Sequence, residues 1–190
     1  YPYENKEIVL LIGEAEDKLE AQDLVYKYSD IKNCKKELLE TKKFWKEKLS
    51  RLQVKTPSES MNIMLNGWAM YQTISSRLFA RSGFNQSGGA FGFRDQLQDS
   101  ISTKFLNTEI MKKQILKHAA HQFIEGDTEH WWHDETKRGI RSRFSDDRLW
   151  LVYVTIKYIK YSGDYSILDI EIPYIEGKKF EYPIYLDMEE

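Results

Sequence analysis

The chain has 190 residues and a formal net charge of -2, and its Lys and Arg residues alternate with Asp and Glu instead of forming a basic run. With 41% hydrophobic residues and a mean hydropathy of -0.61, the composition excludes a disordered tail and argues against a membrane protein. The charge pattern excludes an electrostatic footprint for nucleic acid or anionic lipid. Cys34 is the one cysteine, so we expect neither an internal disulfide nor a cysteine-rich metal site, and a reducing, cytoplasmic setting.

The N-terminal part of the chain contains one apolar run and one long amphipathic segment. Residues 8–12 are aliphatic or β-branched and are followed by Gly13, which predicts a short buried strand. Apolar residues then recur at helical spacing among Lys and Glu over residues 36–52. This pattern predicts an amphipathic helix with one buried stripe, typical of a linker between two domains.

The next helix has a complete start signal. Thr56 is placed as the N-cap, Pro57 takes the first helical position, and Glu59 follows three residues after Thr56 to close a capping box. Apolar residues then follow one face until a glycine-rich stretch at residues 82–92 interrupts the period. We therefore expect a helix from residue 56 to about residue 81.

Three further helices are predicted in the second half of the chain. Residues 95–105 and 108–123 have helical apolar periods, and a third helix is expected to start at residues 145–147 and to end near Gly163. Residues 125–145 show neither a helical nor a strand period, which predicts a loop.

The glycine-rich loop carries side chains suited to binding a sugar. Its glycines permit close backbone approach, and Arg94, Asp95 and Gln98 offer hydrogen-bond partners for hydroxyl groups. The glycine spacing fits neither a dinucleotide fingerprint nor a phosphate-binding P-loop. On residue types alone, a helix-start ion pair of Arg94 with Asp95 or Asp99 is the alternative interpretation.

The second loop contains two adjacent tryptophans between two histidines. Trp131 and Trp132 offer indole faces that stack on sugar rings, although either one is equally well explained as a core residue. His130 and His133 are three residues apart, which is not the spacing of a helical zinc site, and no third ligand is evident. We therefore predict no metal at this loop.

Asp146 and Asp147 are the candidate acids. A glycosidic bond is cleaved when a carboxylic acid protonates its oxygen, and an inverting enzyme admits the attacking group from the opposite face of the sugar. Phosphate is itself a nucleophile, so a phosphorylase needs only one protein acid. The alternative is that the run Ser145-Asp146-Asp147 is an ordinary helix start, because the positive end of the helix dipole favours ionised aspartates.

Three motifs together resemble glycoside hydrolase family 94. They are Gly-Ala-Phe-Gly-Phe-Arg-Asp-Gln-Leu-Gln-Asp at 89–99, His-Trp-Trp-His at 130–133 and Arg-Phe-Ser-Asp-Asp-Arg-Leu-Trp-Leu at 143–151. That family contains cellobiose, chitobiose and cellodextrin phosphorylases and the C-terminal module of cyclic β-1,2-glucan synthases. Residues 53–177 look similar throughout, closest to the β-1,2-glucan branch.

The resemblance implies a mainly α fold, a six-fold α/α toroid of helical hairpins preceded by a β-sandwich and a helical linker. Residues 1–35 would then be the end of the sandwich with its linker, residues 36–55 the linker helix, and residues 56–190 the first part of the toroid. Family members are several times longer, so we expect a partial chain. The missing part of the toroid or a second copy is the expected protein partner.

The resemblance also implies an activity, namely inverting phosphorolysis or transfer of β-glucosyl units from an oligosaccharide. Arg94 and Asp95 would hold the glucosyl unit, Asp146 would be the general acid with Asp147 as the alternative, and Gln98, Trp131 and Trp132 would contact substrate. Inorganic phosphate is the implied co-substrate, with no cofactor, and its binding residues would lie beyond Glu190. The alternatives are an inverting β-glucan hydrolase and a non-catalytic or vestigial glucan-binding fragment.

Overall fold

The computed structural model describes residues 4–82, 88–179, 188 and 189. The chain divides into two compact units, residues 1–48 and 49–190. The first unit contains helix α1 (Lys18–Tyr28) and nearly all of α2 (Ile31–Leu49), which confirms a long helix in the region expected at residues 36–52 but starts and ends it earlier. The buried stripe expected on this helix is wrong, because none of its residues is buried. Helix α1 was not predicted; its N-cap Asp17 accepts hydrogen bonds from two backbone N–H groups of the first turn.

The strand predicted at residues 8–12 is absent. These residues form neither helix nor strand, and Ile8, Leu10 and Ile12 are 91%, 82% and 90% exposed. A strand needs a neighbour to satisfy its backbone hydrogen bonds, and none pairs with this segment in the part of the chain that the structure describes. The prediction of a buried strand here is wrong.

The second unit opens with a continuous helical stretch of α3 (Glu59–Ile63), η1 (Met64–Trp68), α4 (Ala69–Gln72) and η2 (Thr73–Phe79), in which η1 and η2 have π-helical hydrogen bonding. The predicted cap is two residues too early. Ser58 is the N-cap, and its hydroxyl accepts a hydrogen bond from the backbone of Met61. Thr56 instead bonds to the Asn62 side chain, 2.8 Å away, so the capping-box prediction is wrong although the helix itself is present.

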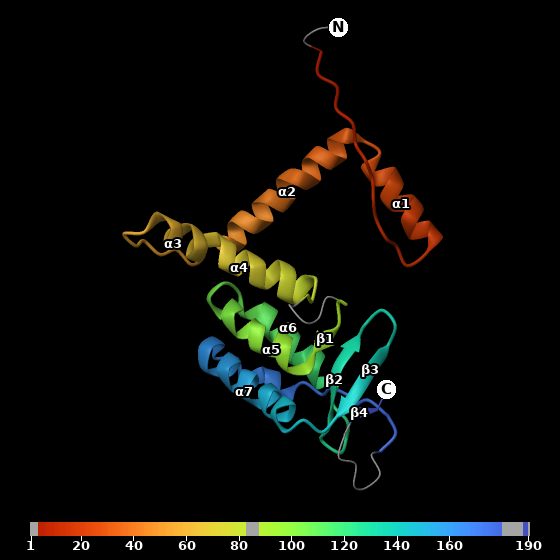
Figure 1. The fold of residues 1–190 in the computed structure, drawn as a ribbon, viewed down its shortest axis with the longest axis vertical. Helices are drawn as coiled ribbons and strands as arrows, with labels where there is room; N and C mark the ends of the chain where they lie inside the picture. The colour runs from red at the N-terminus through yellow and green to blue at the C-terminus, as the bar shows by residue number, and fades with distance from the viewer. Residues whose placement is uncertain (1–3, 83–87, 180–187, 190) are drawn as a thin grey trace. The chain divides into compact units, whose positions relative to one another are not determined.

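Three helices make the body of this unit: α5 (Phe93–Ser100), α6 (Thr108–Ala119) and α7 (Ser145–Ser162) pack against one another, with short 3-10 turns η3 (Ile101–Phe105) and η4 (Tyr165–Asp169) beside them (Figure 1). Gly163 ends α7 with a φ of 73°, as the sequence predicted. Helices and the two strands β1 and β2 contribute the core, which consists of Phe91, Phe93, Leu97, Met111, Ile115, Trp132, Val154, Tyr158 and Ile167.

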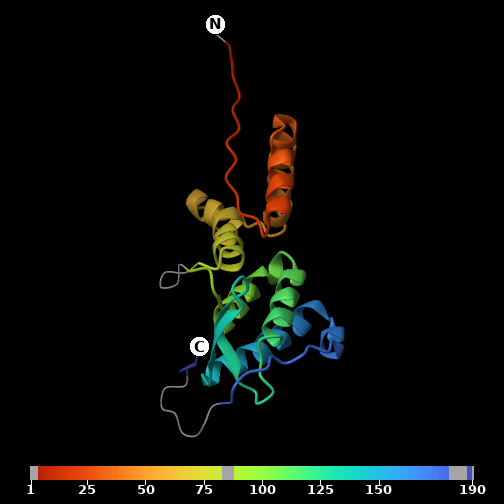
Figure 2. The same ribbon diagram turned by 90° about the vertical axis from the view of Figure 1, so that its right-hand side faces the viewer.

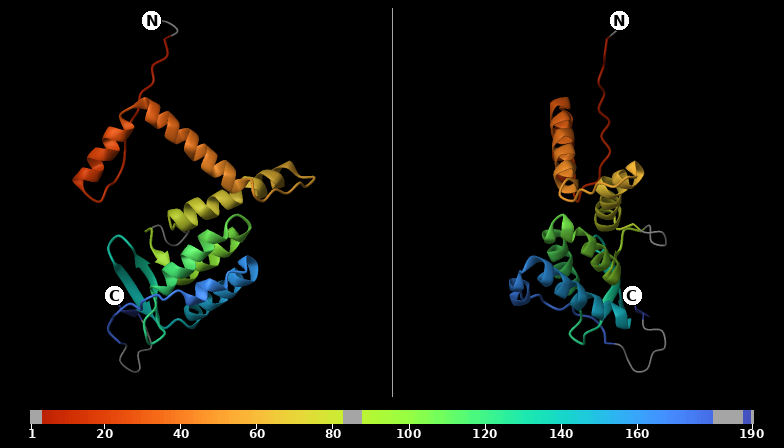
Figure 3. Two further views of the ribbon diagram at one scale, coloured as in Figure 1. Left: turned by 180° about the vertical axis from the view of Figure 1, so that it is seen from behind. Right: turned by 90° about the vertical axis from the view of Figure 1, so that its left-hand side faces the viewer.

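A small antiparallel sheet covers one end of these helices. Its order is β1 (Phe91–Gly92), β2 (Thr128–His133), β3 (Arg138–Ser142) and β4 (Met188–Glu189). β1 leads directly into α5 and β3 is followed closely by α7, so the sheet lies at the start of both helices (Figures 2 and 3). The loop predicted at residues 125–145 is therefore wrong, because its middle is the β2–β3 hairpin.

The hairpin was not recognised because its strands do not alternate regularly. The register places Glu129 opposite Arg141 and Trp131 opposite Ile140, so that His130 is an extra residue on β2, a β-bulge. A bulge places two consecutive side chains on one face and thereby removes the period of two on which strand prediction depends.

The mainly helical fold is confirmed within the described residues, whereas the six-fold toroid and the domain boundaries at residues 35 and 55 stay predictions. Among the residues that the structure describes, no helix is both long and apolar enough to cross a membrane.

Candidate functional site

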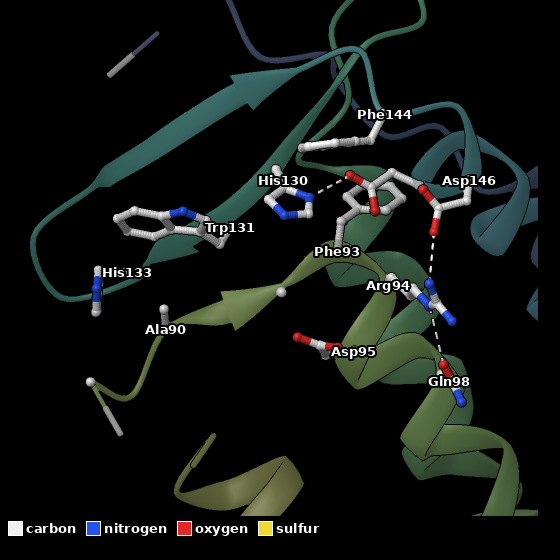
Figure 4. Close-up of a pocket in the computed structure, with 13 residues that line it drawn as sticks. Ala90, Phe93, Arg94, Asp95, Gln98, His130, Trp131, His133, Phe144 and Asp146 are labelled. Carbon is white, nitrogen blue, oxygen red and sulfur yellow. Dashed lines mark hydrogen bonds and ion pairs between the residues drawn. The ribbon is translucent and has the colours of Figure 1, made fainter. Parts of the chain in front are cut away.

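A pocket of about 790 Å³ lies where β1, β2 and the first turns of α5 and α7 meet (Figure 4). It brings together the two sequence stretches that carry sugar-binding chemistry, which are about 40 residues apart. Its lining consists of Gly88, Ala90, Gly92, Phe93, Arg94, Asp95, Gln98, His130, Trp131, His133, Phe144, Asp146 and Asp147. Residues 83–87 of the glycine-rich loop lie outside the described residues.

Arg94 links the two helices that border the pocket. Its Nη1 lies 2.9 Å from Asp146 Oδ2, and its Nε donates to Gln98 Oε1 over 3.3 Å. The alternative pairing with Asp95 or Asp99 is wrong. Adjacent side chains on a helix diverge, and Asp99 is taken by Arg77 at 2.7 Å.

The tight turn between β1 and α5 positions Asp95. A Cβ on Gly92 would lie 2.5 Å from Asp95 Oδ2, so only glycine admits the carboxylate this close to the backbone. The buried side chain of Gln96 accepts a hydrogen bond from the Gly92 N–H at 2.6 Å. The role of Gln96 could not be predicted from the sequence, because it depends on a strand that has no local sequence signal.

Buried His118 of α6 also supports this turn. Its Nδ1 lies 2.7 Å from the Gln114 carbonyl oxygen, and its Nε2 lies 3.3 Å from that of Gly92. Burial lowers the pKa of His118 to about 4, so the imidazole is neutral at physiological pH. The role of His118 could not be predicted from the sequence, since a lone histidine on a helix gives no signal.

The ordinary alternation of β2 after the bulge separates the two tryptophans. Trp131 lines the pocket together with His130, whereas Trp132 points into the core and is 2% exposed. Phe91 stacks on the Trp132 ring at 5.3 Å between centroids, and His121 stacks on it at 3.8 Å. Because its ring has no face left for a sugar, the prediction that Trp132 contacts substrate is wrong.

Asp146 and Asp147 are neighbours in sequence but occupy different environments. The Asp146 side chain is 47% exposed and paired with Arg94, whereas that of Asp147 is 1% exposed and accepts a hydrogen bond from His130 Nδ1 at 2.8 Å. Helix α7 has no side-chain cap hydrogen bond, but both aspartates lie in its first turn, where the helix dipole favours ionised carboxylates, so the helix-start interpretation is compatible with the structure. The other oxygen of Asp147, Oδ1, is buried without a hydrogen-bond partner among the described residues.

The charges in the pocket sum to a negative value. The hydrogen bond that His130 donates to Asp147 raises the pKa of His130 above its ordinary value of 6.5, and the carboxylates of Asp95 and Asp146 act in the same direction. Even with His130 protonated, these three carboxylates outweigh the cations of His130 and Arg94 in the pocket lining. Such a pocket favours an uncharged ligand over a phosphate group. In the described part of the chain, no group of three or more His, Cys, Asp and Glu side chains is placed to hold a metal ion.

Comparison with known proteins gives consistent matches. A model of the glycosyl hydrolase 94 superfamily, catalytic domain, matches residues 44–188. The chain is 41% identical over 140 residues to the cyclic beta-(1,2)-glucan synthase NdvB of Rhizobium meliloti (strain 1021), which covers 74% of this chain and 5% of that protein. It is 30% identical over 178 residues to the N,N'-diacetylchitobiose phosphorylase of Vibrio proteolyticus, covering 79% of this chain and 22% of that protein.

A solabiose phosphorylase of Paenibacillus borealis is 28% identical over 125 residues, which covers 66% of this chain and 15% of that protein. The chain thus spans less than a quarter of the length of each of these relatives. The family matches over most of the chain, and the resemblance carried by the three sequence motifs is confirmed. This chain belongs to the glycosyl hydrolase 94 superfamily.

Proposed function

We propose that the chain is part of an enzyme that transfers or phosphorolyses β-glucosyl units with inversion, and that the pocket binds the glucosyl unit. The names of the relatives, a glucan synthase and two disaccharide phosphorylases, support this reaction class. In this proposal the chain contributes the first part of a six-fold α/α toroid. Phosphate is the co-substrate, and residues outside this chain bind it.

The observation that carries the proposal is the combination of aromatic faces and hydroxyl-binding groups in one pocket. Trp131 and the half-exposed ring of Phe144 supply apolar faces of the kind that stack on a sugar ring. Arg94, Asp95 and Gln98 supply donors and acceptors for hydroxyl groups. A volume of about 790 Å³ lies within the range of small-molecule sites, and the negative charge argues for a neutral sugar.

The general-acid role of Asp146, with Asp147 as the alternative, is a separate part of the proposal. A general acid must carry a proton, whereas an ion pair with a cation favours the ionised carboxylate. Asp146 is paired with Arg94, and Asp147 with His130. Asp146 can act as the acid only if the glucosyl unit displaces Arg94, and otherwise it serves to orient Arg94 toward the sugar.

Replacing Arg94 or Asp95 by alanine is expected to weaken binding of β-glucosides about 10-fold or more, because each change removes a charged hydrogen-bonding group from the pocket. Titration calorimetry with sophorose and cellobiose measures this loss. The melting temperature should change little, since the Arg94–Asp146 pair is half-exposed and such pairs contribute about 1 kcal/mol or less.

The matched control is Arg138→Ala, which removes an exposed arginine of β3 outside the pocket and should leave binding intact. A collapse of the melting temperature with normal sugar binding by the folded fraction would contradict the proposal and leave Arg94 with a structural role. With the full-length enzyme, sugar release that does not require phosphate would indicate hydrolysis. Binding without turnover would indicate a glucan-binding protein.

Replacing Asp146 by asparagine tests its role in the full-length enzyme. We expect a rate loss of about 10²- to 10⁴-fold for a β-glucoside disaccharide, because asparagine cannot supply the proton that the leaving oxygen needs. The loss should shrink for β-glucosyl fluoride, because fluoride leaves without a proton. A loss of about 10-fold that is equal for both substrates would contradict the acid role and leave Asp146 to orient Arg94, and the full effect in Asp147→Asn instead would move the acid role to Asp147.

A further inference from the structure

The bulge at His130 determines which side chains of β2 enter the pocket. In a regular strand consecutive side chains point to opposite faces, so that His130 and Trp131 would be separated. The register shift between Glu129 and Trp131 leaves His130 as the extra residue, and both side chains line the pocket as a result. Bulges of this kind re-aim a side chain and are frequent beside functional sites.

Contacts with Asp147 and Phe144 hold the imidazole of His130 in place. Its Nδ1 lies 2.8 Å from Asp147 Oδ2, and the Ser142 hydroxyl lies 3.5 Å from the same oxygen. The Phe144 ring packs against the imidazole at 4.6 Å between centroids. With one ring nitrogen bound to α7, the other faces the space bordered by Trp131, Asp95 and Arg94 in Figure 4.

The buried charge of Asp147 explains why a histidine lies beside it. A carboxylate that is 1% exposed requires a compensating partner, and His130 is the charged partner in contact with it among the described residues. Asp147 Oδ1 is buried without a hydrogen-bond partner among the described residues, which makes a cation beside the carboxylate more favourable. The pair therefore favours the protonated imidazolium, in which both ring nitrogens are donors.

We propose that His130 is a specificity-determining residue of the pocket, which donates its Nε2 hydrogen to a hydroxyl group of the glucosyl unit beside Trp131. The inference rests on the proposed function, since it names a contact within the same sugar site. A hydroxyl accepts a hydrogen bond more strongly from an imidazolium than from a neutral donor. Sugar binding is therefore expected to depend on the protonation of His130.

Charged and titratable groups from α5, α7 and β2 surround His130. Asp146 and Asp147 belong to α7, and Arg94 and Asp95 to α5; His133, on β2 itself, lines the same pocket. The hydrogen bond to Asp147 and the neighbouring carboxylates raise the pKa of His130 above 6.5. The imidazolium is fully formed at lower pH and is lost as the pH rises through this raised pKa, so sugar affinity should fall over the same interval.

The experiment measures sophorose affinity from pH 5.5 to 9 for the wild-type chain and for His130→Gln. We expect the wild-type affinity to fall severalfold as the pH rises through the pKa of His130. His130→Gln retains a hydrogen-bonding side chain but cannot titrate, so it should bind about 10-fold more weakly at pH 6, with a flat profile. The matched control His121→Gln removes a histidine that stacks on Trp132 outside the pocket and should keep the wild-type pH profile.

A second readout does not depend on the variant folding. If the protonated form binds sugar more tightly, sophorose must raise the pKa of His130 measured by NMR of the wild-type chain. An unchanged pKa, with an unchanged pH profile in His130→Gln, would overturn the inference. In that case a binding loss in Arg94→Ala would show that the sugar still occupies the pocket. Failure of the wild-type chain to bind either sophorose or cellobiose would instead overturn the proposed function, and the role of His130 with it.

Discussion

Replacing Asp127 by alanine is expected to lower the free energy of unfolding by about 3 kcal/mol, the cost of leaving a buried charge without its partner. The Asp127 side chain is 8% exposed and accepts from Arg141 Nη2 at 2.9 Å and from Arg148 Nη2 at 2.7 Å. Arg141 is itself 6% exposed, so removal of the carboxylate leaves its guanidinium buried beside fewer acceptors. Urea unfolding of the wild type and of Asp127→Ala measures the difference.

The matched control for this network is Glu125→Ala. Glu125 also pairs with Arg141, at 3.0 Å, but its side chain is 28% exposed, and water can replace it. We expect a loss of about 1 kcal/mol or less for this variant. If the two variants lose the same free energy of unfolding, Asp127 has no special role in holding the hairpin to the start of α7.

The parts of the fold that follow from local pattern were predictable. Helical spacing located the helix now seen at Ile31–Leu49, and a glycine after an apolar period located the end of α7. The errors concern features set by distant partners. The apolar run at residues 8–12 resembles a strand, but a strand requires a neighbour, and periodicity alone cannot supply one. The β2–β3 hairpin was missed because the bulge at His130 breaks the alternation.

The pocket shows the same division between what local sequence predicts and what distant partners determine. Residue chemistry and the family resemblance together selected Arg94, Asp95, Gln98, the two tryptophans at 131 and 132 and the two aspartates at 146 and 147, and the structure places all of them except Trp132 around one pocket. The interactions between them were not predictable. Arg94 pairs across 52 residues with Asp146 and not within its own turn, and the choice between the two tryptophans depends on the register of β2. His130 was considered only as a metal ligand, whereas its partner is the buried Asp147.

A second large effect is expected from His118, which should make the stability of the chain depend on pH. His118 is 0% exposed, and burial lowers its pKa from 6.5 to about 4. In the unfolded chain the imidazole takes up a proton near pH 6.5, whereas in the folded chain it does so only near pH 4. The contribution of neutral His118 to the free energy of unfolding is therefore complete above pH 6.5 and is lost as the pH falls from 6.5 to about 4.

The difference between the pKa of His118 in the unfolded chain and in the folded chain corresponds to about 3 kcal/mol in the free energy of unfolding, since each tenfold change in proton affinity contributes about 1.4 kcal/mol. Urea unfolding between pH 7.5 and 4 should show this loss in the wild type. In His118→Phe, which fills the same space without titrating, the decline should be smaller by about that amount. His133→Gln, which removes a partly exposed histidine, should retain the wild-type decline. Parallel curves for the wild type and His118→Phe would show that His118 binds its proton equally well in the folded and unfolded chain, and that burial does not keep it neutral.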